Sequence, residues 1–495
     1  MPSELNGIFR KKAREMKKNP SADASSKQVE YDEHVPLKSK FGVGFANMGS
    51  SFMSAIGLGT IDVYYIKVYG ANPSLLALSW LLFIVWNMIN DPIIGILEEK
   101  TKTRWGRRIP YLRFGAIPYA LSFILVWFPF MQGEFGLFLN HLLMLFVFDT
   151  FFSMTGLITF SLPSEMAVTA KERNKINLFT VAFGTFGMIS RWIMEPVFLS
   201  GDHPNQLVFQ IVVTIFGIIS GLLIFSSSYL IKERLYTQKE EAFGFIKSIT
   251  ETLKNRPFLI IEVAIFFMTI IAEMLFNGFI YLFDYIFIFS ELTIFFFIPA
   301  LIVLIVLGIW ANSKIGPWGL KKVMILGGLI ALIGYLMMFF IGLALNSKIP
   351  FEIGSFGIAF IGVGLLMFMV NQSPLMGEAI DNDEIRTGKR RETTYSGVNA
   401  LITKPAVSIG HSLLLGIIGL FGYQQGVEVS NQPETVATGV LIALTIVPII
   451  CIIIAVIALY FNPLEGKEWQ AKKRHLQEVH MQKEKDYLEG LKKNV

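Results

Sequence analysis

The chain has 495 residues, of which 53% are hydrophobic and only 16% are charged, and its mean hydropathy is +0.54. A soluble chain of this length would carry about 25% charged residues, so this composition excludes an ordinary soluble protein. Its one cysteine, Cys451, excludes a disulfide framework, and its six scattered histidines form no metal-ligand motif.

Apolar residues come in long blocks, each sufficient to cross the roughly 30 Å of bilayer hydrocarbon as a helix. We predict twelve spans, at residues 41–69, 75–98, 111–131, 136–162, 175–200, 206–231, 257–288, 292–312, 320–344, 352–373, 394–422 and 436–461. Residues 1–20 are basic and have no apolar core, which excludes a cleaved signal peptide. The sequence therefore predicts an all-α, multi-pass integral membrane protein.

The positive charges are distributed unevenly along this pattern. All but four of the 43 Lys and Arg residues lie in segments that share one side of the membrane with both termini. The exceptions are Lys67, Arg191 and Lys404 within spans, and Lys348 in a loop on the other side. Because Lys and Arg mark cytoplasmic loops, both termini are predicted to be cytoplasmic, most simply in the plasma membrane. The net charge of +5 then reflects topology and anionic lipid, and not nucleic-acid binding.

The two halves of the chain share a signature. Gly95 is followed ten residues later by Trp105-Gly106, and Gly308 is followed ten residues later by Trp318-Gly319. The duplication predicts two six-helix pseudo-repeats, the plan of the major facilitator fold, with a site near the midplane between them. The predicted parts are a cytoplasmic tail (1–40), a six-helix bundle (41–231), a cytoplasmic linker (232–256), a second bundle (257–461) and a cytoplasmic tail (462–495).

Two stretches carry a family resemblance. Residues 90–115, NDPIIGILEEKTKTRWGRRIPYLRFG, resemble the second span and following loop of the glycoside–pentoside–hexuronide:cation symporters, a melibiose-carrier-like family. Residues 378–405, EAIDNDEIRTGKRRETTYSGVNALITKP, resemble that family's loop into the eleventh span. The resemblance implies a cation-coupled secondary transporter of a sugar, glycoside or related polyhydroxylated solute, which works by alternating access.

The second span carries the candidate cation site. Asn87, Asn90 and Asp91 lie at i, i+3 and i+4, so they share one helix face. An ionised side chain at mid-bilayer costs about 2.5–3.5 kcal/mol, and Asp91 therefore needs a function. The resemblance implies that Asp91 binds the coupling cation, H⁺ or Na⁺, with Lys404 nearby. In the family a second aspartate stands at Asn87, and its loss favours proton coupling or an uncoupled carrier. The alternative is that Asp91 only closes a gate with loop arginines.

The substrate site is predicted from polar stripes. At the positions with which the melibiose carrier grips its galactoside, this chain has Ser51, Thr155, Thr159, Val181 and Met369, so that specificity is absent. Side chains that donate and accept hydrogen bonds suit a polyhydroxylated ligand. The candidates are Thr155 and Asp149 in span four, Glu273, Asn277 and Tyr281 in span seven, Asn371 and Gln372 in span ten, and Asn399 in span eleven. The alternative is that such groups join helices.

Other charges are assigned to gating or pairing. Arg104, Arg107 and Arg108 are predicted to form a latch that pairs with neighbouring helix ends, or simply to mark topology. Asp62, and Arg191 with Glu195, are predicted to form structural pairs.

Three classes of function can be compared with this sequence. The first is the symporter, a monomer that binds a small solute, a monovalent cation and the bilayer, and has neither a cofactor nor a metal beyond transported Na⁺. The second is a carrier of a lysolipid or other amphiphile, or an uncoupled sugar uniporter, on the same scaffold. A polar chamber would favour sugar, and a lateral opening lined with Phe and Met would favour lipid. The third, an enzyme or receptor, is disfavoured because the sequence lacks catalytic and nucleotide-binding motifs.

Overall fold

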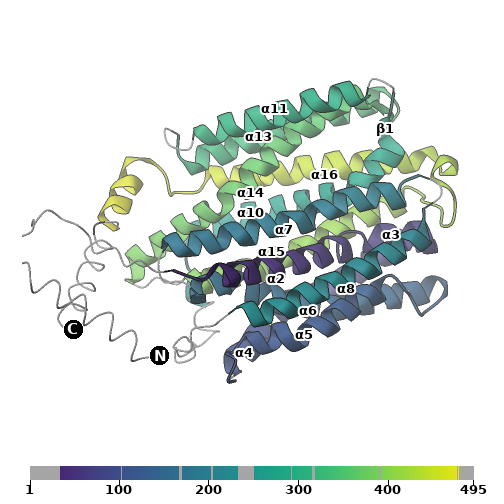
Figure 1. The fold of residues 1–495 in the computed structure, drawn as a ribbon. Coiled ribbons are helices and arrows are strands. Elements are labelled where there is room, and N and C mark those ends of the chain that lie inside the picture. The colour runs from purple at the N-terminus through teal and green to yellow at the C-terminus, as the bar shows by residue number, and fades with distance from the viewer. Residues whose placement is uncertain are drawn as a thin grey trace, which may run out of the picture.

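The computed structural model describes residues 34–101, 103–166, 170–201, 204–231, 250–290, 293–314, 318–388, 392–476 and 478. Most of these residues form long helices that run side by side in one bundle (Figure 1). The first half contains α2 (Leu37–Gly57), α3 (Ile61–Tyr69), α4 (Pro73–Lys100), α5 (Ile109–Val126), α6 (Gly133–Met166), α7 (Ala170–Leu199) and α8 (Gln206–Leu230). The second contains α10 (Arg256–Tyr281), η2 (Leu282–Ile286), β1 (Phe287–Ile288), α11 (Thr293–Ser313), α13 (Leu320–Ala344), β2 (Ile349–Pro350), α14 (Phe351–Thr387), α15 (Glu392–Leu420), η3 (Val429–Asn431) and α16 (Glu434–Tyr460).

Within the described residues, ten helices have the length and apolar composition of membrane spans. They are α4, α5, α6, α7, α8, α10, α13, α14, α15 and α16. The two remaining predicted blocks fall on shorter pieces. Block 41–69 is divided between α2 and α3, and block 292–312 lies on α11, whose described apolar stretch is Ile302–Ala311.

The break between α2 and α3 lies beside a charged side chain. A Cβ at Gly59 would overlap the Arg191 guanidinium, which α7 brings to this point. Gly59, in the turn that follows α2, therefore allows the backbone to approach the Arg191 side chain closely. This break positions Asp62 at the start of α3.

The helices of the two halves pair in the same order. In the first half, α2 packs on α7 and α8, α5 on α6 and α8, and α4 on α6. In the second half, α10 packs on α15 and α16, α13 on α14 and α16, and α11 on α14. Between the halves, α4 lies along α15. Two of the sites described below include α15 and join the halves, whereas the cavity described below lies within the first half.

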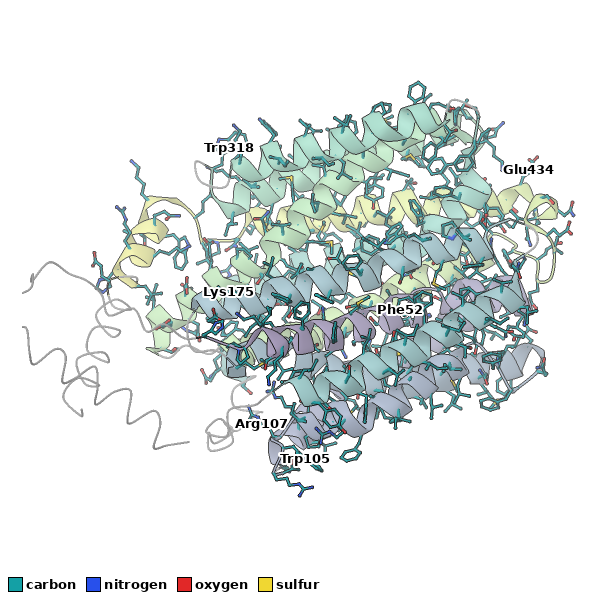
Figure 2. The ribbon with its side chains drawn as sticks, viewed as in Figure 1. Phe52, Trp105, Arg107, Lys175, Trp318 and Glu434 are labelled. Atoms are coloured by element: carbon teal, nitrogen blue, oxygen red, sulfur yellow. The ribbon has the colours of Figure 1, made fainter. Side chains whose placement is uncertain are left out.

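The bundle has two distinct ends. We call the end where α2 begins and α16 ends the near end, and the end with the turn between α3 and α4 the distal end (Figure 1). Figure 2 shows Trp105 and Trp318 at the near end, on opposite edges of the bundle, and Glu434 at the distal end. The distal strands β1 and β2 are parallel, and Phe287 pairs with Ile349.

Three predicted parts fall partly outside the described residues. These are the tail 1–40, described from residue 34, the linker 232–256, described from residue 250, and the tail 462–495, described to residue 476 and at residue 478. In the last of these, a helix over residues 466–476 docks at the near end. Its Trp469 is buried, and Lys473 Nζ lies 3.1 Å from Glu378 Oε1 of α14.

Candidate functional site

An ion pair joins the two halves at the centre of the bundle. Lys404 Nζ of α15 donates to Asp91 Oδ1 of α4 at 2.5 Å and to Ser153 Oγ of α6 at 2.9 Å. Pro92 and Pro405 directly follow the paired residues, so each helix lacks a backbone donor at that point. The ion pair is only partly buried, with side-chain exposures of 17% for Lys404 and 14% for Asp91. It is therefore within reach of water.

The asparagines of α4 surround this pair. Asn87 Nδ2 donates to the Lys404 carbonyl at 3.1 Å and to Ser408 Oγ at 3.3 Å. Asn90 Nδ2 donates to Asp149 Oδ2 at 2.8 Å, while its Oδ1 atom is buried and has no hydrogen-bond partner among the described residues. Such an oxygen is an available ligand for a cation. The structure thus brings Asn87, Asn90, Asp91 and Lys404 together, and their cation-binding role stays a prediction.

A second polar cluster lies toward the distal end, around the buried carboxylate of Asp62. Asp62 Oδ1 accepts from Trp80 Nε1 at 2.8 Å and contacts His141 Nε2 at 3.0 Å. Its Oδ2 contacts His411 Nδ1 at 2.6 Å. The indole of Trp80 also stacks on the imidazole of His411, with 3.8 Å between ring centroids. Because His411 belongs to α15, this cluster too joins the halves.

The Asp62 cluster continues to α7 through an amide. Asn277 Nδ2 contacts His411 Nε2 at 3.0 Å, and Asn277 Oδ1 accepts from an Arg191 guanidinium nitrogen at 2.8 Å. Arg191 Nε donates to Glu195 Oε2 at 3.0 Å, which confirms the predicted pairing. Arg191 is therefore shared between its own helix and α10 of the other half.

A third contact between the halves closes the distal end. Lys67 of α3 forms an ion pair with Asp284 in the π-helical turn η2, and both side chains are buried. Lys67 also donates to the Leu199 carbonyl, and Asp284 accepts from the Gly201 backbone N–H.

A cavity of about 270 Å³ lies between α2, α6 and α7, within the first half. Its lining residues are Asn47, Ser50, Ser51, Ser54, Phe152, Gly156, Thr159 and Thr180. Only Phe152 among them is a large apolar side chain. The volume lies just below the roughly 300–1,000 Å³ usual for ligand pockets. The lining side chains are mainly serine, threonine and asparagine, whose hydroxyl and amide groups can bond a ligand rich in hydroxyl groups, while carbon atoms form most of the exposed surface.

The predicted substrate residues are dispersed. Thr155 is buried and bonds to the Phe151 carbonyl, Asp149 holds Asn90, and Asn371 bonds to the Met367 carbonyl. Glu273 and Asn277 belong to the Asp62 cluster, whereas the buried Tyr281 hydroxyl has no hydrogen-bond partner among the described residues. Asn399 donates to Glu262, and Gln372 is exposed. Among the positions aligned with the galactoside-binding residues of the melibiose carrier, Ser51 and Thr159 line the cavity.

The predicted latch residues lie at the near end. The Arg104 guanidinium carbon lies 4.7 Å from the centre of the Trp105 ring, on which Arg113 also packs at 4.9 Å. Arg108 immediately precedes α5, and Figure 2 places Arg107 beside Trp105 at the edge of the bundle. The latch role stays a prediction.

Sequence reasoning missed three buried ionisable side chains, His141, His411 and Glu262. Each lies inside an apolar block, and that was the available signal, because an ionisable group in hydrocarbon is costly without a partner. Among the described residues, no group of three or more His, Cys, Asp or Glu side chains is arranged to hold a metal ion.

Outside the spans, Glu172 organises the near end of the first half. Its carboxylate lies 2.7 Å from Lys175 Nζ, 2.7 Å from Lys40 Nζ and 3.2 Å from the Val35 backbone nitrogen. Hydrogen bonds from Lys175 and Lys40 lower the pKa of Glu172 to about 2. The carboxylate thereby joins α2 to the start of α7.

Comparison with known proteins agrees with this architecture. The isoprimeverose transporter of Lactiplantibacillus pentosus is 23% identical, covering 79% of this chain and 81% of its own. The symporter YnaJ of Bacillus subtilis is 26% identical, covering 91% and 96%. Among solved structures, an inward-facing, unoccupied bacterial homologue of the human lysosomal transporter Spinster matches with a TM-score of 0.60 and 13% identity, covering 90% of this chain and 99% of that one. A D-xylose–proton symporter matches with a TM-score of 0.56 and 15% identity, covering 86% and 97%.

The sequence family described as MFS/sugar transport protein matches residues 40–466, which is most of the chain. These relatives are membrane transporters and not enzymes. The chain belongs to this family, the glycoside–pentoside–hexuronide branch of the major facilitator superfamily.

Proposed function

We propose that this protein is a cation-coupled symporter that moves a sugar, glycoside or related polyhydroxylated solute by alternating access. The observation that carries the proposal is the cavity of about 270 Å³ lined by serine, threonine and asparagine. Relatives named as an isoprimeverose transporter and as a putative glycoside/cation symporter support the solute class. The lining carries several hydroxyl groups and an amide but only one phenylalanine and no methionine, which favours a sugar over an amphiphile.

The cavity and the Asp91 ion pair are linked through α6. Ser153 bonds to Lys404, and its neighbours Phe152 and Gly156 line the cavity. Solute that fills the cavity can therefore influence how α6 holds Lys404. In this scheme the coupling cation binds Asp91, with Asn87, Asn90 and Asp149 nearby, and takes the place of the Lys404 ammonium.

We further propose twelve membrane crossings in two six-helix halves. The matching order of helix pairs in the halves supports the duplication, with α2 and α3 forming the first crossing and α11 the eighth. Both termini are then cytoplasmic, and the distal end faces outward. Lys67–Asp284 and the Asp62 cluster close that outer end, which corresponds to an inward-facing state.

Uptake of pooled radiolabelled mono- and disaccharides, glycosides and uronides into proteoliposomes tests the proposal. Wild-type protein is expected to take up at least one of these, and Ser51→Ala is expected to raise its KM because Ser51 lines the cavity. Ser226→Ala is the matched control, since Ser226 is exposed on α8 and bonds to its own helix. Absence of uptake for every sugar, with transport of a labelled lysolipid, would assign the scaffold to amphiphiles.

A further inference from the structure

One histidine nitrogen in the Asp62 cluster lies between a donor and an acceptor. His411 Nδ1 faces the Asp62 carboxylate at 2.6 Å, so this nitrogen carries a hydrogen. His411 Nε2 lies 3.0 Å from Asn277 Nδ2, which is a donor, and 3.7 Å from Glu273 Oε2, which is an acceptor. The Nε2 atom of neutral His411 can accept a hydrogen bond from Asn277, whereas in protonated His411 the same nitrogen is a donor and needs Glu273 Oε2 as its acceptor.

The orientation of the Asn277 amide is fixed by its other partner. Arg191 has only donors, so the atom that it contacts at 2.8 Å must be the Asn277 oxygen. The Asn277 nitrogen therefore points to His411, and it also donates to the Glu273 carbonyl at 2.7 Å and to Glu273 Oε2 at 3.1 Å. A proton on His411 Nε2 would oppose that nitrogen, break the contact between them and compete with it for Glu273 Oε2. Because Asn277 also accepts from Arg191 of the other half, protonation of His411 would affect a contact between the two halves.

The cluster is buried but not sealed. The side chains of Asp62 and His411 are 4% and 2% exposed, while that of Glu273 is 27% exposed. Glu273 is therefore the accessible member, through which a proton can exchange with water. The other titratable or charged groups that face the cluster are His141 on α6, Tyr281 on α10, and Arg191 and Glu195 on α7, with Lys67 and Asp284 at the distal edge.

His141 differs from His411 in its placement. It lies on α6, in the same half as Asp62, so its contact with Asp62 does not join the halves. Its Nδ1 faces Ser79 Oγ at 2.6 Å, and that hydroxyl also contacts the Leu76 carbonyl of its own helix. A proton on His141 would strengthen contacts within one half only.

We propose that His411 and Asp62 form a proton-binding site, separate from Asp91, that closes the distal end when it is occupied. A proton from water reaches Glu273 and binds the Nε2 lone pair of His411. The new N–H is donated to Glu273 Oε2, and the imidazolium forms an ion pair with Asp62 across the halves. Loss of the proton leaves a hydrogen bond from the neutral imidazole to the Asp62 carboxylate, which is weaker than the ion pair. The inference rests on the proposed alternating access and adds H⁺ as a ligand of the outer gate.

Spin-label distances across the distal end test this site without any solute. Labels at Ser200→Cys and Glu428→Cys lie on opposite halves and are exposed, and Cys451→Ser removes the native thiol. In lipid nanodiscs titrated from pH 8.5 to 5, the distance distribution is expected to shift to shorter values in one step. A distribution that does not change with pH would overturn the proposal.

Variants identify the titrating group. His411→Gln is expected to abolish the shift, and Glu273→Gln is expected to move its midpoint to lower pH, because the protonated form loses the negative charge of its acceptor. His141→Gln is expected to keep the shift, and its loss there alone would assign the proton to His141 instead. If His411→Gln does not fold, the midpoint in Glu273→Gln still decides, since an unchanged midpoint contradicts the site.

Asp91→Asn separates this inference from the proposed transport function. The distal shift is expected to persist in Asp91→Asn even though cation-driven uptake fails. If the shift disappears in that variant, the pH response belongs to the Asp91 site, and a separate proton site at His411 is wrong. Sugar uptake that fails in wild-type protein, with the distal shift intact, would contradict the proposed function and leave this inference standing.

Discussion

At the residue scale, the chemistry of the molecule depends on which charges face each other across α4 and α15. The spacing of Asn87, Asn90 and Asp91 on one helix face was predictable, because helical periodicity is local. The Asp62–His411 contact was not, since its partners are 349 residues apart and an isolated histidine in an apolar block gives no indication of what it faces. The local sequence pattern predicts which residues share a polar helix face, but the residues that this face contacts are known only from the fold.

Replacing the Asp91 carboxylate tests the proposed cation site. Asp91→Asn is expected to reduce gradient-driven solute accumulation at least about tenfold, which corresponds to about 1.4 kcal/mol of lost coupling. Counterflow exchange of solute, which needs no net cation movement, should continue. Glu428→Gln in the distal loop is the control and should accumulate normally. Unchanged cation dependence in Asp91→Asn would contradict the assignment.

At the element scale, the apolar blocks predicted the helices well, since hydrocarbon length fixes helix length. Block 206–231 became α8 and block 320–344 became α13. Two features were not predictable. The end of α2 depends on Arg191 arriving from α7, and α14 continues past the predicted end at 373 to Thr387, beyond the apolar pattern.

Close packing of α13 on α14 can be tested with two glycines of the same helix. A Cβ at Gly364 would overlap the Gly327 carbonyl oxygen and lie 2.5 Å from Ala331 Cβ, whereas one at Gly377 meets no atom within 4 Å. Gly364→Ala is therefore expected to destabilise the protein by about 1–3 kcal/mol. Gly377→Ala is expected to be neutral or stabilising by about 0.5–1 kcal/mol. Thermal unfolding in detergent measures both, and equal melting temperatures would contradict the packing.

The Glu172 cluster predicts a pH dependence for the junction of α2 and α7. Because the folded pKa of about 2 lies below the unfolded value of about 4.3, ionised Glu172 stabilises the fold at neutral pH. Glu172→Gln should therefore lower the melting temperature by a constant amount from pH 8 to 5. The difference should narrow only as the pH falls from about 4.3 toward 2. A difference that disappears by pH 6 would show that another group is responsible.

At the scale of the whole molecule, the proposed alternating access requires the two ends of the bundle to open in turn. The Lys67–Asp284 ion pair joins the halves at the distal end, and removing the lysine takes away the cation that balances the buried Asp284 carboxylate. Lys67→Met is therefore expected to favour distal opening.

Cysteine accessibility measures that opening. In a Cys451→Ser background, a cysteine at Ser51 in the cavity should react several-fold faster with an impermeant maleimide from the distal side when Lys67→Met is present. Lys348→Met is the matched control, because the described bond of Lys348, to the Tyr285 carbonyl, lies within the second half. Equal rates in Lys67→Met and wild type would mean that the pair does not hold the gate.

Accumulation against a gradient tests the central claim most directly. Proteoliposomes are loaded with the solute identified by the pooled screen, and its internal and external concentrations are compared under an imposed H⁺ gradient, an imposed Na⁺ gradient and none. Coupling predicts an internal concentration above the external one under at least one gradient and equality without a gradient. Equality under every condition would make the protein a uniporter and contradict cation coupling.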